Sequence, residues 1–403
     1  MSRVLIIDPS YATFTGHNHA VNSLLLEEAR GRGLDALVFA HSALPAADRV
    51  IPAFRTTAYG FSPENSLDVL QHAHSIGRSF AEDLAGRVQP LLVKDTVIFV
   101  HTLNNPLLHG FVAWLASLAA PHEVTVRVGF NLPPDFRQRR QDVALWNAHQ
   151  YAFALKLLTA VAPGARFYAE TRELQSLFAG FGAPSVSHRR LPLRVLTPPD
   201  GRVTAGGDGR LIYHVPGEVR AEKGHEFLIN GILRIAERRP AWLERIRFRF
   251  TSIGMPAEVA RFLLAHGALF EIVPETSISV DRYWQLMEEA DVVGCTYDPA
   301  DYATRASGIF LEALALGKPV LVSNRTSVGA EVAADGYAYG IGVDFGDVDS
   351  LASGLERMVS SYDALRRGAE AVADRVRNEL SAASFFDWLL GKQSGGDPMV
   401  SVP

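Results

Sequence analysis

The amino-acid sequence predicts an α/β protein made of two Rossmann-like, doubly wound domains. Short apolar runs alternate with longer helical patterns from the first residues onward, which is typical of βαβ units and parallel sheets. A stretch with three prolines and four glycines, residues 192–210, interrupts this series, and a second series of the same kind follows it. The length of 403 residues fits two domains, or at most three, at roughly 150 residues each.

The first series predicts a domain over residues 1–190. Its expected strands are short apolar runs at residues 3–8, 34–40, 95–103 and 123–130. Residues 20–33 and 107–120 have the apolar spacing of helices. We expect a linker over residues 191–209.

The second series predicts a domain over residues 210–375. Its expected strands lie at residues 210–217, 246–254, 270–274, 291–297 and 319–323, and its expected helices at 223–239, around 283–290 and around 310–317. The apolar run at 384–390 predicts a terminal helix within residues 376–390, and packing on the first domain is one option for it. Residues 391–403 are expected to form a flexible tail.

Composition excludes several classes of protein. A net charge of −5 argues against binding nucleic acid through bulk positive charge. The single cysteine, Cys295, cannot form an intramolecular disulfide, so the cytoplasm is the expected compartment. No run of apolar residues approaches the roughly 20 needed to span a membrane. Peripheral contact with the inner face of a membrane stays open, as does the oligomeric state.

The turn after residue 214 is the first candidate site. A strand ends there, a glycine-containing turn follows, and a helix is predicted to start just after Lys223. Such a turn aims backbone N–H groups at the carboxyl edge of the sheet, where open α/β sheets bind ligands. With the charges of Arg220 and Lys223, it suits a diphosphate. The alternative is that both cations are solvated and pair with Glu218 and Glu222.

Residues 298–323 form the second candidate site. Ser307 and Gly308 lie at an expected helix N-terminus whose amides suit a phosphate, with the Ser307 hydroxyl as cap or ligand and Arg305 nearby. Glu312 is an acid inside an apolar run, which predicts a half-buried carboxylate able to accept both hydroxyl protons of a ribose diol. An ordinary exposed glutamate is the alternative.

Other catalytic and metal motifs have little support. Asp347 and Asp349 resemble a metal-binding Asp-x-Asp, but the pair precedes a predicted helix and suits a turn and N-cap. The histidines show no zinc-ligand spacing, and we expect no metal. The sequence also has no G-x-S-x-G elbow, no P-loop and no G-x-G-x-x-G at the first strand, which removes the main support for hydrolase, P-loop and dehydrogenase functions.

Roughly residues 210–360 resemble the nucleotide-binding domain of retaining glycosyltransferases of the GT-B fold, of the kind grouped in glycosyltransferase family 4. Those proteins have a G-R-x-x-x-x-K-G turn. Here Gly217, Lys223 and Gly224 match it, Glu218 stands in place of the arginine, and Arg220 is a candidate for that charge.

The family also has a glutamate, seven residues, and then Glu-Ala before a Gly-x-Pro-Val strand entry. Glu312 with the residue after it and residues 316–320 match, whereas the first glutamate falls at Thr304. In the family that acid contacts the donor sugar, so this departure implies either a different mode of sugar binding or reduced activity. Residues 273–293 and 341–358 extend the resemblance.

The resemblance implies a glycosyltransferase that moves a sugar from a nucleotide-diphosphate sugar to a hydroxyl of a carbohydrate or glycoconjugate, with retention, as in polysaccharide biosynthesis. Two domains would face a cleft, the second holding the donor and the first mainly the acceptor. The nucleotide sugar is the donor substrate, and no cofactor is expected. Arg220 and Lys223 would stabilise the leaving diphosphate. The other expected donor contacts are Gly16, Gly217, Val273, Thr304, Arg305, Ser307, Gly308 and Glu312.

In the first domain the resemblance is looser. Gly16 lies in the first strand-to-helix turn, where GT-B enzymes place a glycine facing donor phosphate or acceptor, although a tight turn alone also explains it. Expected acceptor contacts are His17, His101, Asn104 and Arg127. Ordinary turn chemistry is the alternative for Asn104.

Two alternative functions remain open. A nucleotide-sugar epimerase can use the same fold, and a non-catalytic homologue acting as partner subunit would explain Thr304 and Glu218. A glycan phosphorylase has less support because the sequence shows no pattern for a cofactor lysine. The base of the nucleotide, expected to be read around residues 272–274, is not ranked among UDP, GDP, ADP and dTDP.

Overall fold

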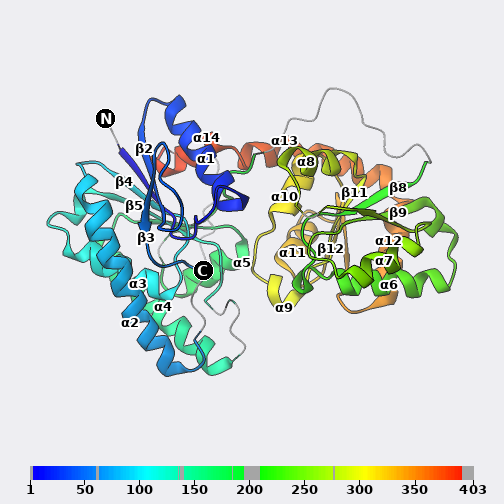
Figure 1. The fold of residues 1–403 in the computed structure, drawn as a ribbon, viewed down its shortest axis with the longest axis horizontal. Helices are drawn as coiled ribbons and strands as arrows, with labels where there is room; N and C mark the ends of the chain where they lie inside the picture. Colours follow the sequence, from blue (N-terminus) through cyan, green and yellow to red (C-terminus); the bar gives the residue numbers. More distant parts are fainter. Residues whose placement is uncertain are drawn as a thin grey trace. The chain divides into compact units, whose positions relative to one another are not determined.

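The computed structural model describes residues 3–59, 63–134, 136, 140–183, 185–194, 209–275 and 277–392. The chain divides into two compact units (Figure 1), one formed by Met1–Arg194 with Glu379–Pro403 and the other by Val195–Asn378. Most of the expected linker and tail, at residues 195–208 and 393–403, lies outside the described residues.

The first unit is built on a seven-stranded parallel sheet with the order β3-β2-β1-β4-β5-β6-β7. The strands are β1 (Arg3–Ile7), β2 (Asp35–His41), β3 (Val50–Phe54), β4 (Val97–Val100), β5 (Thr125–Phe130), β6 (Arg166–Ala169) and β7 (Val186–His188). Strand order reverses between β1 and β4. In open α/β sheets, ligands bind beyond the carboxyl ends of the strands at such a point.

Helices cover both faces of this sheet. They are α1 (Gly16–Gly31), α2 (Ser66–Asp83), α3 (Asn105–Ser117), α4 (Gln141–Val161), α5 (Arg172–Gly180) and α14 (Ala382–Leu389). One apolar cluster joins the sheet to α2, α3, α4 and α5, and another joins its opposite face to α1 and α14. The sheet therefore has the two covered faces expected of a Rossmann-like domain.

Helix α14 contributes large apolar side chains to the first unit. Phe385 lies 5.4 Å, between ring centroids, from both Phe99 of β4 and Tyr168 of β6. The expected terminal helix began at residue 376, but α13 (Tyr362–Glu379) continues past that point and α14 is a separate helix. Its N-cap Ser381 accepts a hydrogen bond from the amide of Ser384, which explains the break.

The second unit has a six-stranded parallel sheet with the order β10-β9-β8-β11-β12-β13. Its strands are β8 (Leu211–Val215), β9 (Ile246–Thr251), β10 (Phe270–Val273), β11 (Val292–Cys295), β12 (Val320–Ser323) and β13 (Gly340–Val343). Strand order reverses between β8 and β11. The predicted fold class, two Rossmann-like α/β domains, is confirmed.

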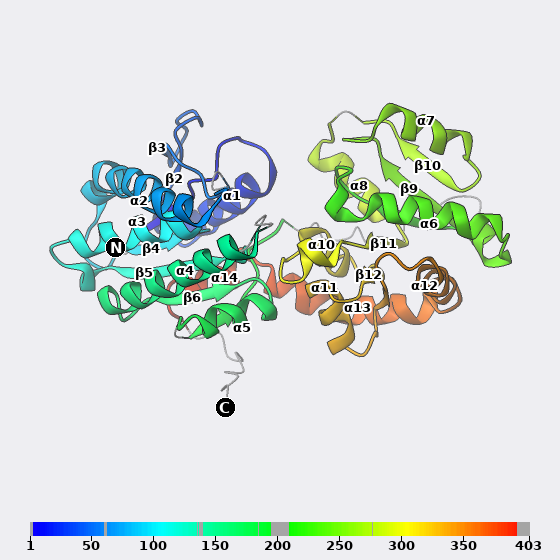
Figure 2. The ribbon, with the colours of Figure 1, turned by 90° about the horizontal axis from the view of Figure 1, so that it is seen from below.

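The helices of the second unit are α6 (His225–Glu237), α7 (Ala257–Ala265), α8 (Val280–Glu289), α9 (Pro299–Tyr302), α10 (Gly308–Ala315), α11 (Ser327–Ala334), α12 (Val348–Ser360) and α13. Helices α6 and α12 lie side by side (Figure 2) and share one apolar cluster with the sheet. Short helical turns occupy Leu84–Val88, Gln89–Leu91, Pro121–Glu123, Ala221–Lys223 and Ala241–Arg245. None of the described helices is both long and apolar enough to cross a membrane.

Candidate functional site

Two loops of the second unit meet where its strand order reverses. One follows β8 and the other follows β11, and they are joined by a hydrogen bond from the amide of Asp298 to the carbonyl of Glu222 at 3.0 Å. The loop after β8 is also tied to β9, because the Thr251 hydroxyl donates to the carbonyl of Gly217 at 2.5 Å. The two loops therefore form one ordered structure at the carboxyl edge of the sheet, where the strand order reverses and where open α/β sheets bind ligands.

Two glycines shape the loop after β8. Gly217 and Gly224 have φ angles of +85° and +71°, in the left-handed region that side chains disfavour. A Cβ on Gly224 would also lie 2.0 Å from the carbonyl oxygen of Thr296, directly after β11. Only glycine therefore lets the N-terminus of α6 approach the end of β11 so closely.

Lys223 is the buried cation of this loop, with 8% of its surface exposed. Its Nζ lies 2.9 Å from the point that a Cβ on Gly217 would occupy. Burial, and then the neighbouring charge of Arg220, lower the pKa of Lys223 to about 8. The side chain remains mostly protonated at neutral pH, so it presents a poorly hydrated ammonium beside a glycine turn.

Arg220 lies at the same loop and forms an ion pair with Glu222 at 3.4 Å. Its side chain is 38% exposed, so the guanidinium is accessible despite this pair. Glu218, which stands in place of the family's arginine, points elsewhere, since its Cγ lies 2.9 Å from a Cβ built on Gly254. Arg220 therefore has the partner that the alternative interpretation predicted, whereas Lys223 is buried beside the turn.

The N-terminus of α10 faces this loop. Ile309 Cδ1 lies 3.8 Å from a Cβ built on Gly217, so the first turn of α10 and the Gly217 turn are neighbours. The Ser307 hydroxyl accepts a hydrogen bond from the amide of Phe310 at 3.2 Å and lies 2.8 Å from the Tyr297 hydroxyl. Ser307 is thus an N-cap, and the exposed Gly308 leads the helix.

Glu312 projects from α10 as a half-buried carboxylate. Its Oε2 accepts a short hydrogen bond from the hydroxyl of Tyr283 on α8. Burial raises the pKa of Glu312, while the bond from Tyr283 and the charge of Lys223 act in the opposite direction. Lys223 and Glu312 are thus close enough to influence each other electrostatically.

The remaining predicted donor contacts lie in the loop before α10 and at the end of β10. The Arg305 guanidinium carbon lies 4.4 Å from the centre of the Tyr302 ring, and Thr304 is half-buried beside it in sequence. Val273 is only 5% exposed, and its carbonyl accepts from the amide of Ser252 at 3.0 Å. The Val273 side chain is therefore buried in the second unit.

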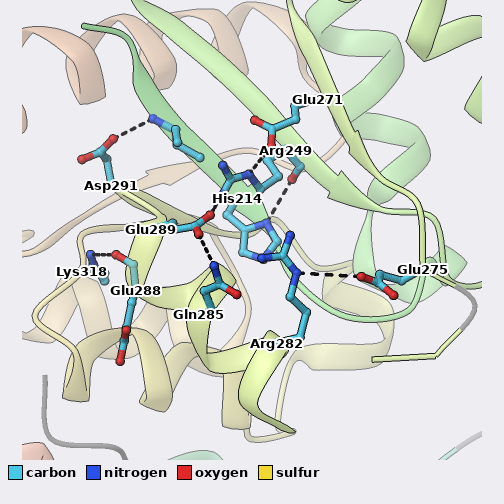
Figure 3. A network of polar contacts seen from close by, with 11 residues as sticks. His214, Arg249, Glu271, Glu275, Arg282, Gln285, Glu288, Glu289, Asp291 and Lys318 are labelled. Atoms are coloured by element: carbon cyan, nitrogen blue, oxygen red, sulfur yellow. Dashed lines mark hydrogen bonds and ion pairs between the residues drawn. The ribbon is translucent and has the colours of Figure 1, made fainter. Parts of the chain in front are cut away.

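Helix α8, which supplies Tyr283, is held to the sheet by a buried polar network (Figure 3). Arg249 of β9 is 7% exposed and donates to Glu271 of β10 and to Glu289 of α8, each at 2.9 Å. Arg282 of the same helix points toward Glu275, 3.9 Å away. These contacts fix the helix on which the partner of Glu312 lies.

Residues 210–361 match the family model described as glycosyl transferases group 1. These residues form a glycosyltransferase domain. The match covers the loop after β8, the loop before α10 and both α8 and α10, so the predicted resemblance to a glycosyltransferase is confirmed for this part of the chain, which identifies a glycosyltransferase enzyme. No curated protein sequence matches the chain.

Solved structures extend the similarity to the whole chain. Sucrose-phosphate synthase from Thermosynechococcus elongatus is 13% identical, with a TM-score of 0.61 over 98% of this chain and 100% of its own. Anabaena HepE in complex with UDP is 14% identical, with a TM-score of 0.62 over 98% and 100%. A UDP-forming trehalose-phosphate synthase from Burkholderia vietnamiensis is 12% identical, with a TM-score of 0.64 over 97% and 98%. The fold of this glycosyltransferase is GT-B.

In the first unit of the glycosyltransferase, Gly16 and two predicted histidines lie near the strand reversal. Gly16 opens α1 with φ +77°, and a Cβ there would meet nothing within 4 Å, so backbone conformation explains the glycine. His101 directly follows β4, is 1% exposed and bonds through Nδ1 to the Thr102 hydroxyl at 2.9 Å, while its Nε2 has no hydrogen-bond partner within the described part of the chain. The exposed His17 lies 6.0 Å from it between ring centroids.

Asn104 and Arg127 contact other residues of the first unit of the glycosyltransferase. Asn104 caps α3 by accepting from the amide of Leu107 at 3.0 Å and donates to the carbonyl of Ala58 at 2.9 Å, as turn chemistry predicted. Arg127 lies within β5, with its guanidinium carbon 6.0 Å from the centre of the Trp388 ring of α14. Burial lowers the pKa of Arg127 to about 10. Both side chains therefore make contacts within the first unit.

Sequence reasoning missed two polar residues at these edges. Asp8, directly after β1, is fully buried and accepts hydrogen bonds from Asn18 and Asn22 of α1, at 2.9 and 2.7 Å. An acid after an apolar strand was the available signal. Tyr283 had no such signal, because an aromatic residue in an amphipathic helix usually packs in the core.

No group of three histidine, cysteine, aspartate or glutamate side chains within the described ranges is arranged to hold a metal ion. Asp347 is the N-cap of α12 and accepts from the amides of Asp349 and Ser350, at 2.9 and 3.1 Å. The interpretation of this pair as turn and cap is confirmed.

Proposed function

We propose that this glycosyltransferase transfers a sugar from a nucleotide-diphosphate sugar to a hydroxyl group of a carbohydrate or glycoconjugate, with retention of anomeric configuration. One observation carries the proposal. The buried Lys223 ammonium lies beside the Gly217 turn, near Glu312, at the carboxyl edge of a glycosyl transferases group 1 domain.

Stabilisation of the leaving diphosphate is the main chemical task in this proposal. Negative charge grows on the diphosphate as the bond to the anomeric carbon breaks, and Lys223, Arg220 and the amide of Gly308 supply positive charge and N–H donors. Preorganised donors of this kind are worth about 10²–10³ in rate. In the retaining reaction the departing phosphate takes the proton of the acceptor hydroxyl, so no separate base is required.

The nucleobase of the donor can be proposed from similar proteins. Solved structures similar to this chain include Anabaena HepE in complex with UDP-glucose and UDP, and UDP-forming trehalose-phosphate synthases. UDP is therefore the first nucleotide to test. In this proposal Glu312 receives the ribose, and the backbone around residues 272–274 lies beside the base.

The acceptor side of the proposal rests on the first unit. His101 has a buried Nε2 without a partner in the described residues, and His17 is exposed next to it. Both can orient a sugar hydroxyl, since a neutral imidazole offers one donor and one acceptor. Burial lowers the pKa of His101, which keeps this ring neutral at physiological pH.

Calorimetric titration with UDP, GDP, ADP and dTDP tests the donor site. We expect micromolar binding of one nucleotide by the unmodified protein and binding weakened about 10- to 100-fold in Lys223→Ala, because a charge-assisted contact is lost. Arg238→Ala is the matched control, since Arg238 is an exposed cation of the same unit that pairs with Asp349. Equal affinity in all three proteins, or no binding at all, contradicts the proposal.

Product analysis separates sugar transfer from the two alternatives. Incubation of the protein with the nucleotide sugar alone reveals an epimerase by formation of the epimeric donor. The replacement of the family's first glutamate by Thr304 favours a non-catalytic partner subunit as the second candidate. Nucleotide binding without release of nucleoside diphosphate, in the presence of a panel of acceptors, would support that candidate.

A further inference from the structure

We propose that Tyr283 is a ribose-recognition residue that shares the ribose diol with Glu312. One hydroxyl of the diol would donate to the open oxygen of the Glu312 carboxylate, and the adjacent hydroxyl would donate to the phenolic oxygen of Tyr283. The proposal rests on the proposed function and names the sugar that its donor must carry, a ribose with both hydroxyls.

The Tyr283 hydroxyl already uses its single proton. It donates this proton to Oε2 of Glu312, so the carboxylate cannot offer both oxygens to a ligand on equal terms. What remains is a row of acceptors, Oε1 of the carboxylate and the lone pairs of the phenolic oxygen. A vicinal diol has two protons to donate, which matches this row better than it matches one carboxylate oxygen.

The position of the phenolic oxygen is fixed by the structure around it. Helix α8 begins with Ser279 as N-cap, which accepts from the amide of Arg282 at 3.2 Å. At the other end, Glu289 is held by Arg249 and by the side-chain amide of Gln285, each at 2.9 Å (Figure 3). The cap defines the start of the helix and Arg249 holds its other end to the sheet, so the Tyr283 hydroxyl stays against Glu312 and this pair is preorganised for a ligand.

Charge places the pair next to the expected diphosphate. Lys223 acts electrostatically on Glu312 and lies beside Gly217, so the carboxylate adjoins the proposed phosphate position. In a nucleotide the ribose directly follows the diphosphate. Lys223 and Glu312 are therefore neighbours, as the diphosphate and the ribose are in the ligand.

The test compares UDP with 2′-deoxy-UDP and 3′-deoxy-UDP by calorimetry. The unmodified protein should bind UDP more tightly than either analogue. In Tyr283→Phe the preference for UDP over one of the two analogues should fall by about 3- to 10-fold, because the partner of one hydroxyl has been removed. Tyr362→Phe is the matched control, since it removes a tyrosine–carboxylate bond elsewhere in the unit, to Asp291 at 3.0 Å.

A pH profile provides a second readout that a purely structural role would not move. The Tyr283 hydroxyl stabilises the charged form of Glu312, so its removal raises the pKa of this carboxyl group. As the pH is lowered, the preference for UDP over the deoxy analogues should therefore begin to fall at a higher pH in Tyr283→Phe than in the unmodified protein. In the Tyr362→Phe control the profile should stay unchanged.

The possible results separate this inference from the proposed function. An unchanged preference for UDP in Tyr283→Phe, with weakened UDP binding in Lys223→Ala, overturns the role of Tyr283 and leaves the donor site standing. Failure of UDP and its analogues to bind overturns the inference for this nucleotide, and failure of every nucleotide contradicts the proposed function too. Glu312→Gln gives a second variant for the same test, because it alters the partner of the adjacent hydroxyl and should reduce the preference for UDP over the other analogue. A loss confined to the same analogue in both variants contradicts the sharing of the diol between the two residues.

Discussion

At the scale of single residues, Lys223 combines burial with a full positive charge. Water cannot solvate this ammonium well, which is why its pKa falls to about 8. A bound diphosphate would replace the missing solvation. In the proposed function an anion would therefore recover part of the energy lost by burying the charge, and Lys223 should favour anionic ligands over neutral ones.

The lowered pKa leads to a prediction about pH. Nucleotide affinity should be full below about pH 8 and fall as the pH rises through the pKa of Lys223, because the deprotonated amine no longer attracts the diphosphate. The stability of the free protein should respond in the opposite sense. The unfolded chain holds this proton up to a higher pH, so the contribution of Lys223 to stability increases as the pH rises above about 8. Calorimetry at a series of pH values checks the first effect, and Lys223→Ala should abolish it.

Gly224 gives a second prediction at this scale. Gly224→Ala should lower the free energy of unfolding by more than about 2 kcal/mol, because the new Cβ would collide with the Thr296 carbonyl in addition to requiring a positive φ. Gly336→Ala is the control. It has φ +66° with nothing within 4 Å, so it should cost only about 1 kcal/mol. Urea denaturation measures both, and equal losses would contradict a steric role for Gly224.

Sequence could locate the loop residues of the site and not their partners. Gly217, Lys223 and Glu312 lie in motifs at strand ends and helix starts, where local spacing carries information. Tyr283 is 29 residues from Glu312 and comes from another helix, so only the packing of α8 against α10 brings the two together. Arg127 is a second example. The sequence marks this residue as part of a strand, but a strand pattern does not reveal that α14, which is distant in the sequence, lies beside its side chain.

At the scale of elements, α8 is held by ion pairs as well as by its buried apolar side chains, Trp284, Leu286 and Met287. Arg249 lies between Glu271 and Glu289, and removing it leaves two partly buried carboxylates without their cation. Arg249→Met should therefore lower stability by about 2–4 kcal/mol. It should also weaken nucleotide binding by loosening the helix that carries Tyr283.

Combining Arg249→Met with Glu271→Gln and Glu289→Gln provides the control for that variant. The neutral set should recover much of the lost stability, because no uncompensated charge remains. Chemical denaturation and calorimetry are the measurements. A triple variant as unstable as the single one would show that Arg249 acts by packing and not by charge.

Element prediction from sequence succeeded where an apolar run marked the strand. The runs at residues 3–8 and 246–254 correspond to β1 and β9. Strands such as β6 (RFYA) and β13 (GIGV) are short and begin with arginine or glycine, and neither was foreseen. Such strands form because their neighbours in the sheet supply hydrogen-bond partners, which local propensity does not encode.

At the scale of the whole molecule, two units with the same parallel architecture share one chain. Their existence was predictable because the alternation of strands and helices restarts after a Pro- and Gly-rich stretch. The sequence predicts a helix near residues 384–390 but does not determine its position, since such an apolar run does not say which sheet it covers. The structure assigns it to the first unit.

This assignment predicts that the last helix controls the stability of the first unit. Phe385→Ala should lower its free energy of unfolding by about 3–5 kcal/mol, since the ring is 1% exposed and packs on Phe99 and Tyr168. Leu157→Ala, at an exposed position of the same unit, should change it by less than about 1 kcal/mol. Thermal unfolding followed by near-UV circular dichroism distinguishes the two, and similar midpoints would contradict the packing role of α14.

The return of the chain to its first unit also affects the order of events during synthesis. A ribosome releases residues 1–194 long before Ala382–Leu389, so the face of the first sheet that α14 covers stays without this helix until the second unit has been synthesised. The second unit, contiguous in sequence, has all of its strands earlier than that. The domain begun first is therefore completed after the second one, and the apolar surface that α14 covers is exposed to aggregation during the interval.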